Sequence, residues 1–169
     1  MRYSANYRDL QKELHARNVG YGTSGYKHAG HVLELAKRME TKEVLDYGCG
    51  TQTLQKNIPW AITNYDPFIA GCDDEPDPHD LVVCSDVLEH IEPDCVPDVL
   101  AHLHSKTKRL LFVDVATRMA KKELADGRNA HLIVEDTNWW LQKLMPYFEV
   151  KSLQSYEGGF VAAFTPNGK

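Results

Sequence analysis

The chain alternates between amphipathic stretches with helical spacing and short runs of apolar, β-prone residues. In the helical stretches, apolar residues recur three or four positions apart, as Leu10 and Leu14 do among charged neighbours. This spacing predicts helices at residues 7–18, 52–57, 93–104 and 137–145, and from a cap at Thr23 or Ser24 to about residue 39. The last of them, in sequence order, is expected to be capped by Thr137. The apolar runs predict strands at residues 43–47, 61–65, 81–85, 109–115, 148–153 and 159–164.

Strands and helices alternate until the last two strands, which are joined by a turn at residues 157–159. This order predicts an α/β fold: a doubly wound, mostly parallel sheet with a C-terminal antiparallel hairpin at its edge. The third α/β unit is shortened, because the segment between Asp66 and Asp80 is too short and too rich in proline for a helix and a strand. We expect a single domain over residues 1–169, in which residues 1–40 form N-terminal helices and a lid.

Composition and charge limit the classes of partner and the compartment expected for this chain. The 169 residues include 19 Lys and Arg against 24 Asp and Glu, a formal charge of −5, which disfavours long nucleic acid. No apolar run is long enough to span a membrane, and residues 1–18 lack the apolar core of a signal peptide. The four cysteines have no CxxC spacing, so we expect reduced, core-filling thiols in a cytoplasmic protein.

The most informative motif is residues 44–51, Val-Leu-Asp-Tyr-Gly-Cys-Gly-Thr. An apolar strand ends there in an acidic residue, Asp46, and opens into a turn formed by Gly48 and Gly50. Twenty residues after Asp46, the next predicted strand ends on Asp66. Glycines let the backbone approach a ligand closely, and an acidic residue at the tip of the second strand can bind both ribose hydroxyls. The layout therefore predicts a nucleoside-binding β-α-β unit.

Three nucleoside-containing cofactors exploit a glycine turn of this kind. An ATP- or GTP-binding P-loop needs a lysine at a fixed spacing, and no lysine follows Gly50 at that position. A dinucleotide fold prefers a third glycine where this chain has Thr53, which disfavours NAD without excluding it. S-adenosylmethionine has no phosphate and needs only the glycine turn and the acidic ribose ligand.

Three blocks together resemble the class I S-adenosylmethionine-dependent methyltransferases, in particular minimal single-domain members similar to methyltransferase type 11. The blocks are residues 44–51, residues 65–67 (Tyr-Asp-Pro) and residues 80–91 (Asp-Leu-Val-Val-Cys-Ser-Asp-Val-Leu-Glu-His-Ile), in the family's order over roughly the first half of the fold. The resemblance implies a Rossmann-like sheet, S-adenosylmethionine as cofactor, and methyl transfer by in-line displacement.

The resemblance also implies which residues bind the cofactor. The methionine end is expected to lie against Asp46 and the turn of Gly48, Cys49 and Gly50, with the Asp46 carboxylate near the ammonium group. The sulfonium is expected beside Ser85, at the tip of the central strand.

At the adenosine end, Asp66 is expected to bind the ribose and Pro67 or Phe68 to pack against adenine. The family places another acidic residue after its third strand to meet the adenine amine, and this chain departs from that pattern. Asp73 or Asp74 is the substitute that the sequence offers.

Catalysis needs an acceptor held in line with the methyl group, water excluded, and a base where the acceptor is an amine or hydroxyl. Asp86, His90 and His131 are the candidate catalytic residues, the last of them in the long polar segment 116–136. Tyr21 and Tyr26 are candidates for an aromatic lid over the methyl group.

Asp86, Glu89 and His90 also form a D-x-x-E-H cluster that, with His131, has the ligand types for a divalent ion. The cluster resembles that of the small-RNA 3′-end 2′-O-methyltransferases. Near-identical segments occur in metal-free methyltransferases, however, and we expect no metal here.

The acceptor is expected to be a small molecule or a modified nucleobase or nucleoside, since the chain has no basic tract and no D-P-P-Y tetrad. One alternative is a non-catalytic cofactor-binding subunit or interaction protein on the same fold. A lower alternative is an NAD-binding Rossmann protein. The sequence predicts neither the acceptor atom nor the oligomeric state.

Overall fold

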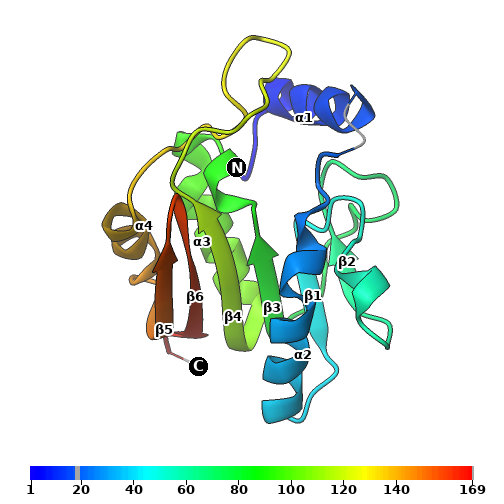
Figure 1. Cartoon of the computed structure of the whole chain (residues 1–169), viewed down its shortest axis with the longest axis vertical. Coiled ribbons are helices and arrows are strands. Elements are labelled where there is room, and N and C mark those ends of the chain that lie inside the picture. The colour runs from blue at the N-terminus through cyan, green and yellow to red at the C-terminus, as the bar shows by residue number, and fades with distance from the viewer. Residues whose placement is uncertain (18–19, 169) are drawn as a thin grey trace.

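The structure, a computed structural model, describes residues 1–17 and 20–168. In this part of the chain, six strands form one mixed sheet in the order β2-β1-β3-β4-β6-β5 (Figure 1). The first four strands in that order are parallel, and β6 is antiparallel to both of its neighbours. Their bounds are Val44–Tyr47 (β1), Thr63–Tyr65 (β2), His79–Ser85 (β3), Thr107–Ala116 (β4), Phe148–Tyr156 (β5) and Gly159–Pro166 (β6). The predicted doubly wound α/β fold with a C-terminal hairpin is confirmed.

The α-helices of the described residues are α1 (Ala5–Arg17), α2 (Ala29–Arg38), α3 (Val96–Lys106) and α4 (Thr137–Leu144). Helix α2 covers one face of the sheet, and α3 and α4 cover the other. A 3-10 helix at Ser24–His28 leads into α2, and shorter 3-10 turns occupy Gln55–Asn57, Leu88–His90 and Pro93–Cys95. None of the described helices is long and apolar enough to cross a membrane.

Alternation along β3 explains why two faces need covering. Leu81 and Val83 pack into a cluster with α2, while Val82 and Cys84 pack into a larger cluster with α3 and α4. All four side chains are at most 1% exposed. A strand buried on both faces requires a continuous apolar run, which is the pattern that identified this segment in the sequence.

Two local predictions need correction. The helix expected at residues 52–57 is only the 3-10 turn at its end, because the first residues of that segment form the turn after the glycine loop. The cap of α4 is Asp136 rather than Thr137: an Asp136 Oδ1 atom accepts a 2.8 Å hydrogen bond from the Trp139 backbone N–H. A carboxylate is as good an N-cap as a hydroxyl, and the run of polar residues at positions 135–138 left the position of the cap open.

The shortened third unit is confirmed. Residues 66–78, all of which the structure describes, contain neither helix nor strand. Consequently β2 is an edge strand of the sheet.

A third apolar cluster fixes α1 over the carboxyl ends of the parallel strands, where Figure 1 shows it crossing the top of the sheet. Tyr7, Leu10 and Leu14 of α1 pack there against Leu124 and Ala130. The last two belong to the long segment between β4 and α4, in which the structure has only an isolated bridge. Two segments far apart in sequence therefore roof the same edge of the sheet.

Candidate active site

The chain reverses its direction across the sheet between β1 and β3. It leaves β1 toward β2 on one side and leaves β3 toward β4 on the other. In α/β sheets, ligands bind in the crevice outside the carboxyl ends at such a switch point. The loop of Gly48 and Gly50 follows β1, and Asp86 follows β3. The sheet thus places the two strongest sequence motifs side by side.

Both glycines of the first loop are conformationally required. Gly48 and Gly50 have φ of 81° and 48°, in the left-handed region. A side chain at Gly48 would overlap Val87, and a Cβ at Gly50 would lie 2.5 Å from the carbonyl oxygen of Gly22. That same carbonyl accepts hydrogen bonds from the Thr51 backbone N–H (2.9 Å) and hydroxyl (3.0 Å). The segment before α2 is therefore docked directly on the glycine loop.

Asp66 joins the loops that follow β1 and β2. Its Oδ2 accepts a hydrogen bond from the Gly50 N–H (3.1 Å), and its Oδ1 accepts one from the Phe68 N–H (3.0 Å). Burial raises the pKa of Asp66, although these two N–H groups oppose the rise. Asp46 lies deeper, 4% exposed, where burial and the Asp66 charge raise its pKa to about 7.

These loops bound a cavity of about 760 Å³, including its mouth. Gly48, Gly50 and Asp66 form one side of the lining, and the Phe68 ring another. Helix α1 contributes Tyr7, whose ring meets that of Phe68 edge-on at 5.8 Å. The cavity thus combines an aromatic end, a buried carboxylate and a bare glycine backbone, which is the combination that an adenosyl amino acid needs.

A second cavity, of about 600 Å³ including its open mouth, adjoins the first at Asp86 and His90. Asp86, His90, Tyr21 and Gly22 line both cavities. The second one is basic, because its lining also includes four cationic side chains: Lys27, Arg118, Lys121 and Lys122.

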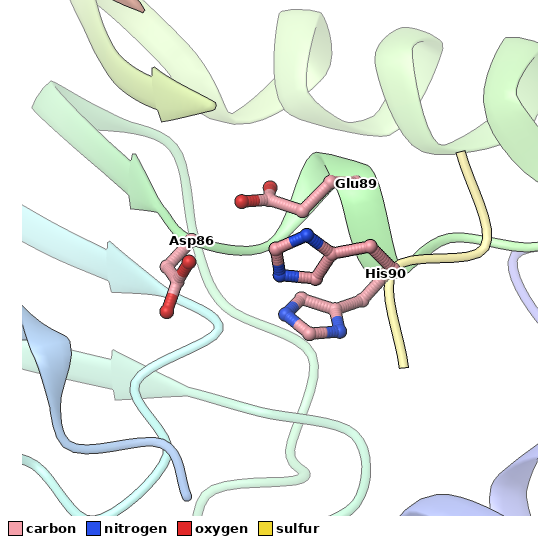
Figure 2. Close-up of side chains that lie close together, drawn as sticks. Asp86, Glu89 and His90 are labelled. Atoms are coloured by element: carbon pink, nitrogen blue, oxygen red, sulfur yellow. The ribbon is translucent and has the colours of Figure 1, made fainter. Parts of the chain in front are cut away.

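Between the cavities, four polar side chains converge at the end of β3. Figure 2 shows three of them, Asp86, Glu89 and His90, lying close together on the turn after that strand. The fourth is His131, whose ring centroid is 4.7 Å from that of His90 at nearly a right angle. Asp86 itself has a left-handed φ of 59°, a strained conformation for a non-glycine residue that the fold holds at this turn.

The side chains of this cluster have pKa values shifted in different directions. Burial opposes ionisation of Asp86, but the Ser24 hydroxyl, which donates a 2.6 Å hydrogen bond, and His90 hold its pKa below the usual range. Complete burial, with the Asp86 charge beside it, raises the pKa of Glu89 well above the usual range. Burial and His131 lower the pKa of His90 to about 4, so its imidazole is neutral.

The sequence matches a family model described as a methyltransferase domain over residues 23–156, which is most of the chain. The chain belongs to this methyltransferase family. The predicted enzyme class and its cofactor, S-adenosylmethionine, are thereby confirmed. A search of curated proteins finds no significant match.

Solved structures resemble the methyltransferase over nearly its whole length. One is 1,6-didemethyltoxoflavin-N1-methyltransferase from Burkholderia thailandensis with its acceptor and S-adenosylhomocysteine (TM-score 0.66, 14% identity, 95% of this chain and 89% of that one). Another is DhpI with S-adenosylhomocysteine (TM-score 0.66, 16% identity, 98% and 100%). A third is the N-methyltransferase NodS from Bradyrhizobium japonicum with S-adenosylhomocysteine (TM-score 0.59, 15% identity, 97% and 100%). At these identities the likeness concerns the fold.

The methyltransferase brings most of the predicted site residues to the first cavity. Those that line it are Gly48, Gly50, Asp66, Pro67, Phe68, Asp86 and His90. His131 lines the basic cavity instead. Asp46, Cys49 and Ser85 are outside both linings: Asp46 and Cys49 are buried, and the Ser85 hydroxyl is buried without a hydrogen-bond partner among the described residues.

Other expectations fall outside the cavities. Asp73 and Asp74 are exposed and line neither cavity, so the structure provides no support for either at the adenine end. Tyr26 is 55% exposed and lines neither cavity, whereas Tyr21 lines both. Of the two lid candidates, only Tyr21 is in position.

Sequence reasoning expected a lid from residues 1–40, but it did not identify the residues of α1 that line the cavity, and it missed the basic loop. Gln11 and His15 of α1 line the first cavity, but a helix far from the glycine motif gives no sign of where it docks. The cations at positions 118, 121 and 122 were a detectable signal, since they lie close together in the long polar segment that also carries the candidate catalytic residue His131.

Proposed function

We propose that the methyltransferase transfers a methyl group from S-adenosylmethionine in the first cavity to a small anionic acceptor in the basic cavity. The acceptor is a small molecule or a nucleoside-type compound that carries a phosphate or carboxylate. The single observation that carries this proposal is that the two cavities share Asp86, His90, Tyr21 and Gly22. Two ligands on either side of these residues meet there.

The charge of the basic cavity supports an anionic acceptor. Lys27, Arg118, Lys121 and Lys122 face only one carboxylate of its lining, that of Asp86. The whole chain has a net charge of −5, so this local excess of positive charge is not a consequence of composition. Clustered cations in a concave site raise the local concentration of anions and orient them.

The first cavity fits the cofactor by its lining. We assign the ribose to Asp66 and adenine to the aromatic end at Pro67 and Phe68, and the methionine part to the backbone of Gly48 and Gly50. Asp46, the third residue of β1, and Cys49, within the loop, are buried outside the cavity lining, and Ser85 ends β3 next to Asp86. Bound there, S-adenosylmethionine supplies a methyl group on a good leaving group.

The residues of this chain supply position and proton handling. The S–CH3 bond breaks as the acceptor–CH3 bond forms, the sulfur retains the bonding pair, and the acceptor's proton leaves to a nearby base. Asp86 and His90, which line both cavities, and His131, which lines the basic cavity, are the side chains available for that task. Helix α1 closes the roof: Tyr7 donates a hydrogen bond to the His90 carbonyl, and Gln11 links Tyr7 to Tyr21. This roof excludes water from the transfer.

We also place the protein in the cytoplasm. Cys49, Cys72, Cys84 and Cys95 are free and buried. Unpaired thiols that fill a core are typical of a reducing compartment.

The experiment is a labelled-methyl screen with two kinds of matched acceptor pair: nucleosides against their monophosphates, and carboxylic acids against their amides. A separate sample contains tRNA. We expect methylation of an acidic member and a weaker reaction with its neutral partner. The double variant Lys121→Glu, Lys122→Glu should raise the KM for that acceptor by about tenfold or more, because two attractive charges become repulsive. Its affinity for S-adenosylhomocysteine should not change.

Two variants calibrate the result. Lys151→Glu, on β5 and outside both cavities, should leave KM unchanged. Asp66→Ala should instead affect the cofactor. S-adenosylhomocysteine should bind at least about tenfold more weakly, since the substitution removes the ribose ligand. Preference for a neutral acceptor, or a KM indifferent to the double charge reversal, would refute the anionic-acceptor proposal.

A further inference from the structure

We propose that Asp86, Glu89, His90 and His131 bind one divalent transition-metal ion at the boundary between the two cavities. One ligand atom from each residue lies within 4.8 Å of the other three. Ligands around one ion with bonds of about 2.2 Å stand at most about 4.4 Å apart, so a contraction of a few tenths of an ångström suffices. This proposal departs from the expectation from sequence, which disfavoured a metal because near-identical motifs occur in metal-free methyltransferases.

The two histidines are oriented as metal ligands. His90 Nδ1 lies 2.7 Å from the Ala130 carbonyl oxygen, and His131 Nδ1 lies 2.6 Å from the Arg118 carbonyl oxygen. A carbonyl only accepts, so each Nδ1 carries the proton and each Nε2 keeps its lone pair. A histidine ligand held through its other nitrogen in this way is the usual arrangement of metal sites. Both rings show this arrangement, with their centroids 4.7 Å apart, which is unexpected for two unrelated histidines.

Each of the two carboxylates also has one oxygen atom held by a hydrogen bond. Glu89 Oε1 accepts a 2.9 Å hydrogen bond from the Ala116 N–H, and Asp86 Oδ2 accepts one from the Ser24 hydroxyl. The second oxygen of Glu89 is fully buried and has no hydrogen-bond partner among the described residues. An unpartnered buried carboxylate oxygen is costly, and a cation in the cluster would satisfy it.

The donor set selects the kind of ion. Two imidazole nitrogens and two carboxylate oxygens suit Mn²⁺, Fe²⁺, Co²⁺ or Zn²⁺, whereas Mg²⁺ and Ca²⁺ prefer oxygen ligands alone. Asp86 is solvent-facing and lines both cavities, so an acceptor can reach the ion from the basic side. Here the inference deepens the proposed function and rests on it. With Asp86, His90 and His131 bound to the ion, these side chains would hold the metal rather than act as the base, and the ion would lower the pKa of an acceptor hydroxyl and hold its oxygen toward the methyl group.

The test is calorimetric titration of tag-free protein, stripped with a chelator and dialysed, with MnCl2, CoCl2 and MgCl2. We expect one Mn²⁺ or Co²⁺ per chain with micromolar or tighter affinity, at least about a hundredfold weaker Mg²⁺ binding, and a Co²⁺ visible absorption typical of nitrogen ligation. The Tm should rise with Mn²⁺.

Glu89→Gln and His131→Gln should each weaken Mn²⁺ binding by about a hundredfold or more and abolish the Tm rise. Glu89→Gln is nearly isosteric and places a neutral side chain where burial opposes a charge, so we expect it to stay folded in the absence of metal. The matched controls are Glu135→Gln and His104→Gln, which lie outside the cluster and should bind Mn²⁺ as the parent chain does.

The outcomes separate the two proposals. Folded protein that binds S-adenosylhomocysteine but no transition-metal ion at millimolar concentration would overturn the metal site and leave the methyl-transfer proposal standing. Ion binding that survives both cluster variants would overturn the site as well. A metal-loaded protein whose acidic acceptors are not methylated would retain the site and refute the anionic-acceptor proposal.

Discussion

Gly48 shows how much of this site depends on a single backbone position. Its left-handed φ is needed for the turn after β1, and the space where a Cβ would stand is filled by Val87 from the loop after β3. The two loops that bound the cofactor cavity are therefore packed against each other through the absence of one side chain.

Gly48→Ala should lower the free energy of unfolding by about 2–4 kcal/mol, because it adds overlap to backbone strain. Gly71→Ala is the matched control: its φ of 85° imposes similar strain, but no atom lies within 4 Å of the added Cβ. It should cost about 1 kcal/mol. Urea denaturation measures both, and equal losses would show that Val87 does not crowd this position. Adding Val87→Ala to Gly48→Ala should recover part of the difference.

Asp46 gives the stability a pH dependence. Its pKa of about 7 in the folded chain lies above the ordinary value of 3.8, so between those values the native state holds a proton that the unfolded chain has released. This contribution is complete below the unfolded pKa and is lost as pH rises through about 7. We expect Asp46→Asn to lose less stability than the parent chain between pH 5 and pH 8 in urea denaturation. Parallel curves for the two proteins would contradict the raised pKa.

At this scale the sequence predicted the cavity residues well, for a physical reason. Carboxyl ends of parallel strands meet at one edge, so Gly48, Asp66 and Asp86 had to converge once their strands were recognised. The sequence did not indicate how deeply each of these side chains is buried relative to the cavity. Asp46 precedes the turn by two residues and is buried behind the loop rather than in the cavity lining, a difference set by packing.

At the scale of elements, the strands were the most predictable and the helix ends the least. Runs such as 81–85 must be buried on both faces and leave a strong pattern, whereas a helix start depends on one hydrogen bond. The docking of α1 on the segment between β4 and α4 had no local signature at all, because Leu10 and Leu124 meet only in the folded chain.

The cap of α4 can be tested directly. Asp136→Ala should cost about 1 kcal/mol of stability, since it leaves the Trp139 N–H without its acceptor. Thr137→Ala should cost clearly less in the same thermal or urea unfolding experiment. A larger loss from Thr137→Ala would restore the cap that the sequence predicted.

For the whole molecule, the distinctive feature is that one α/β unit of the sheet is missing. The chain keeps the switch point of the sheet and dispenses with the third α/β unit, so β2 is an edge and α1 with the long loop provides the cover over the site. The sequence indicated both the loss of that unit and the long polar segment 116–136. It did not indicate that this segment carries Arg118, Lys121 and Lys122 to the cavity that Asp86 lines, because that requires the three-dimensional path of the segment.

The central claim is that the cofactor lies between the glycine loop and α1, with its reactive end toward Asp86. A crystal structure of the protein with S-adenosylhomocysteine tests it most directly. We predict the ribose hydroxyls on Asp66, adenine against Phe68 under Tyr7, and the sulfur facing Asp86 at the passage to the basic cavity. Density for the ligand in another crevice, or with its sulfur turned away from Asp86, would contradict the proposed arrangement of the two cavities.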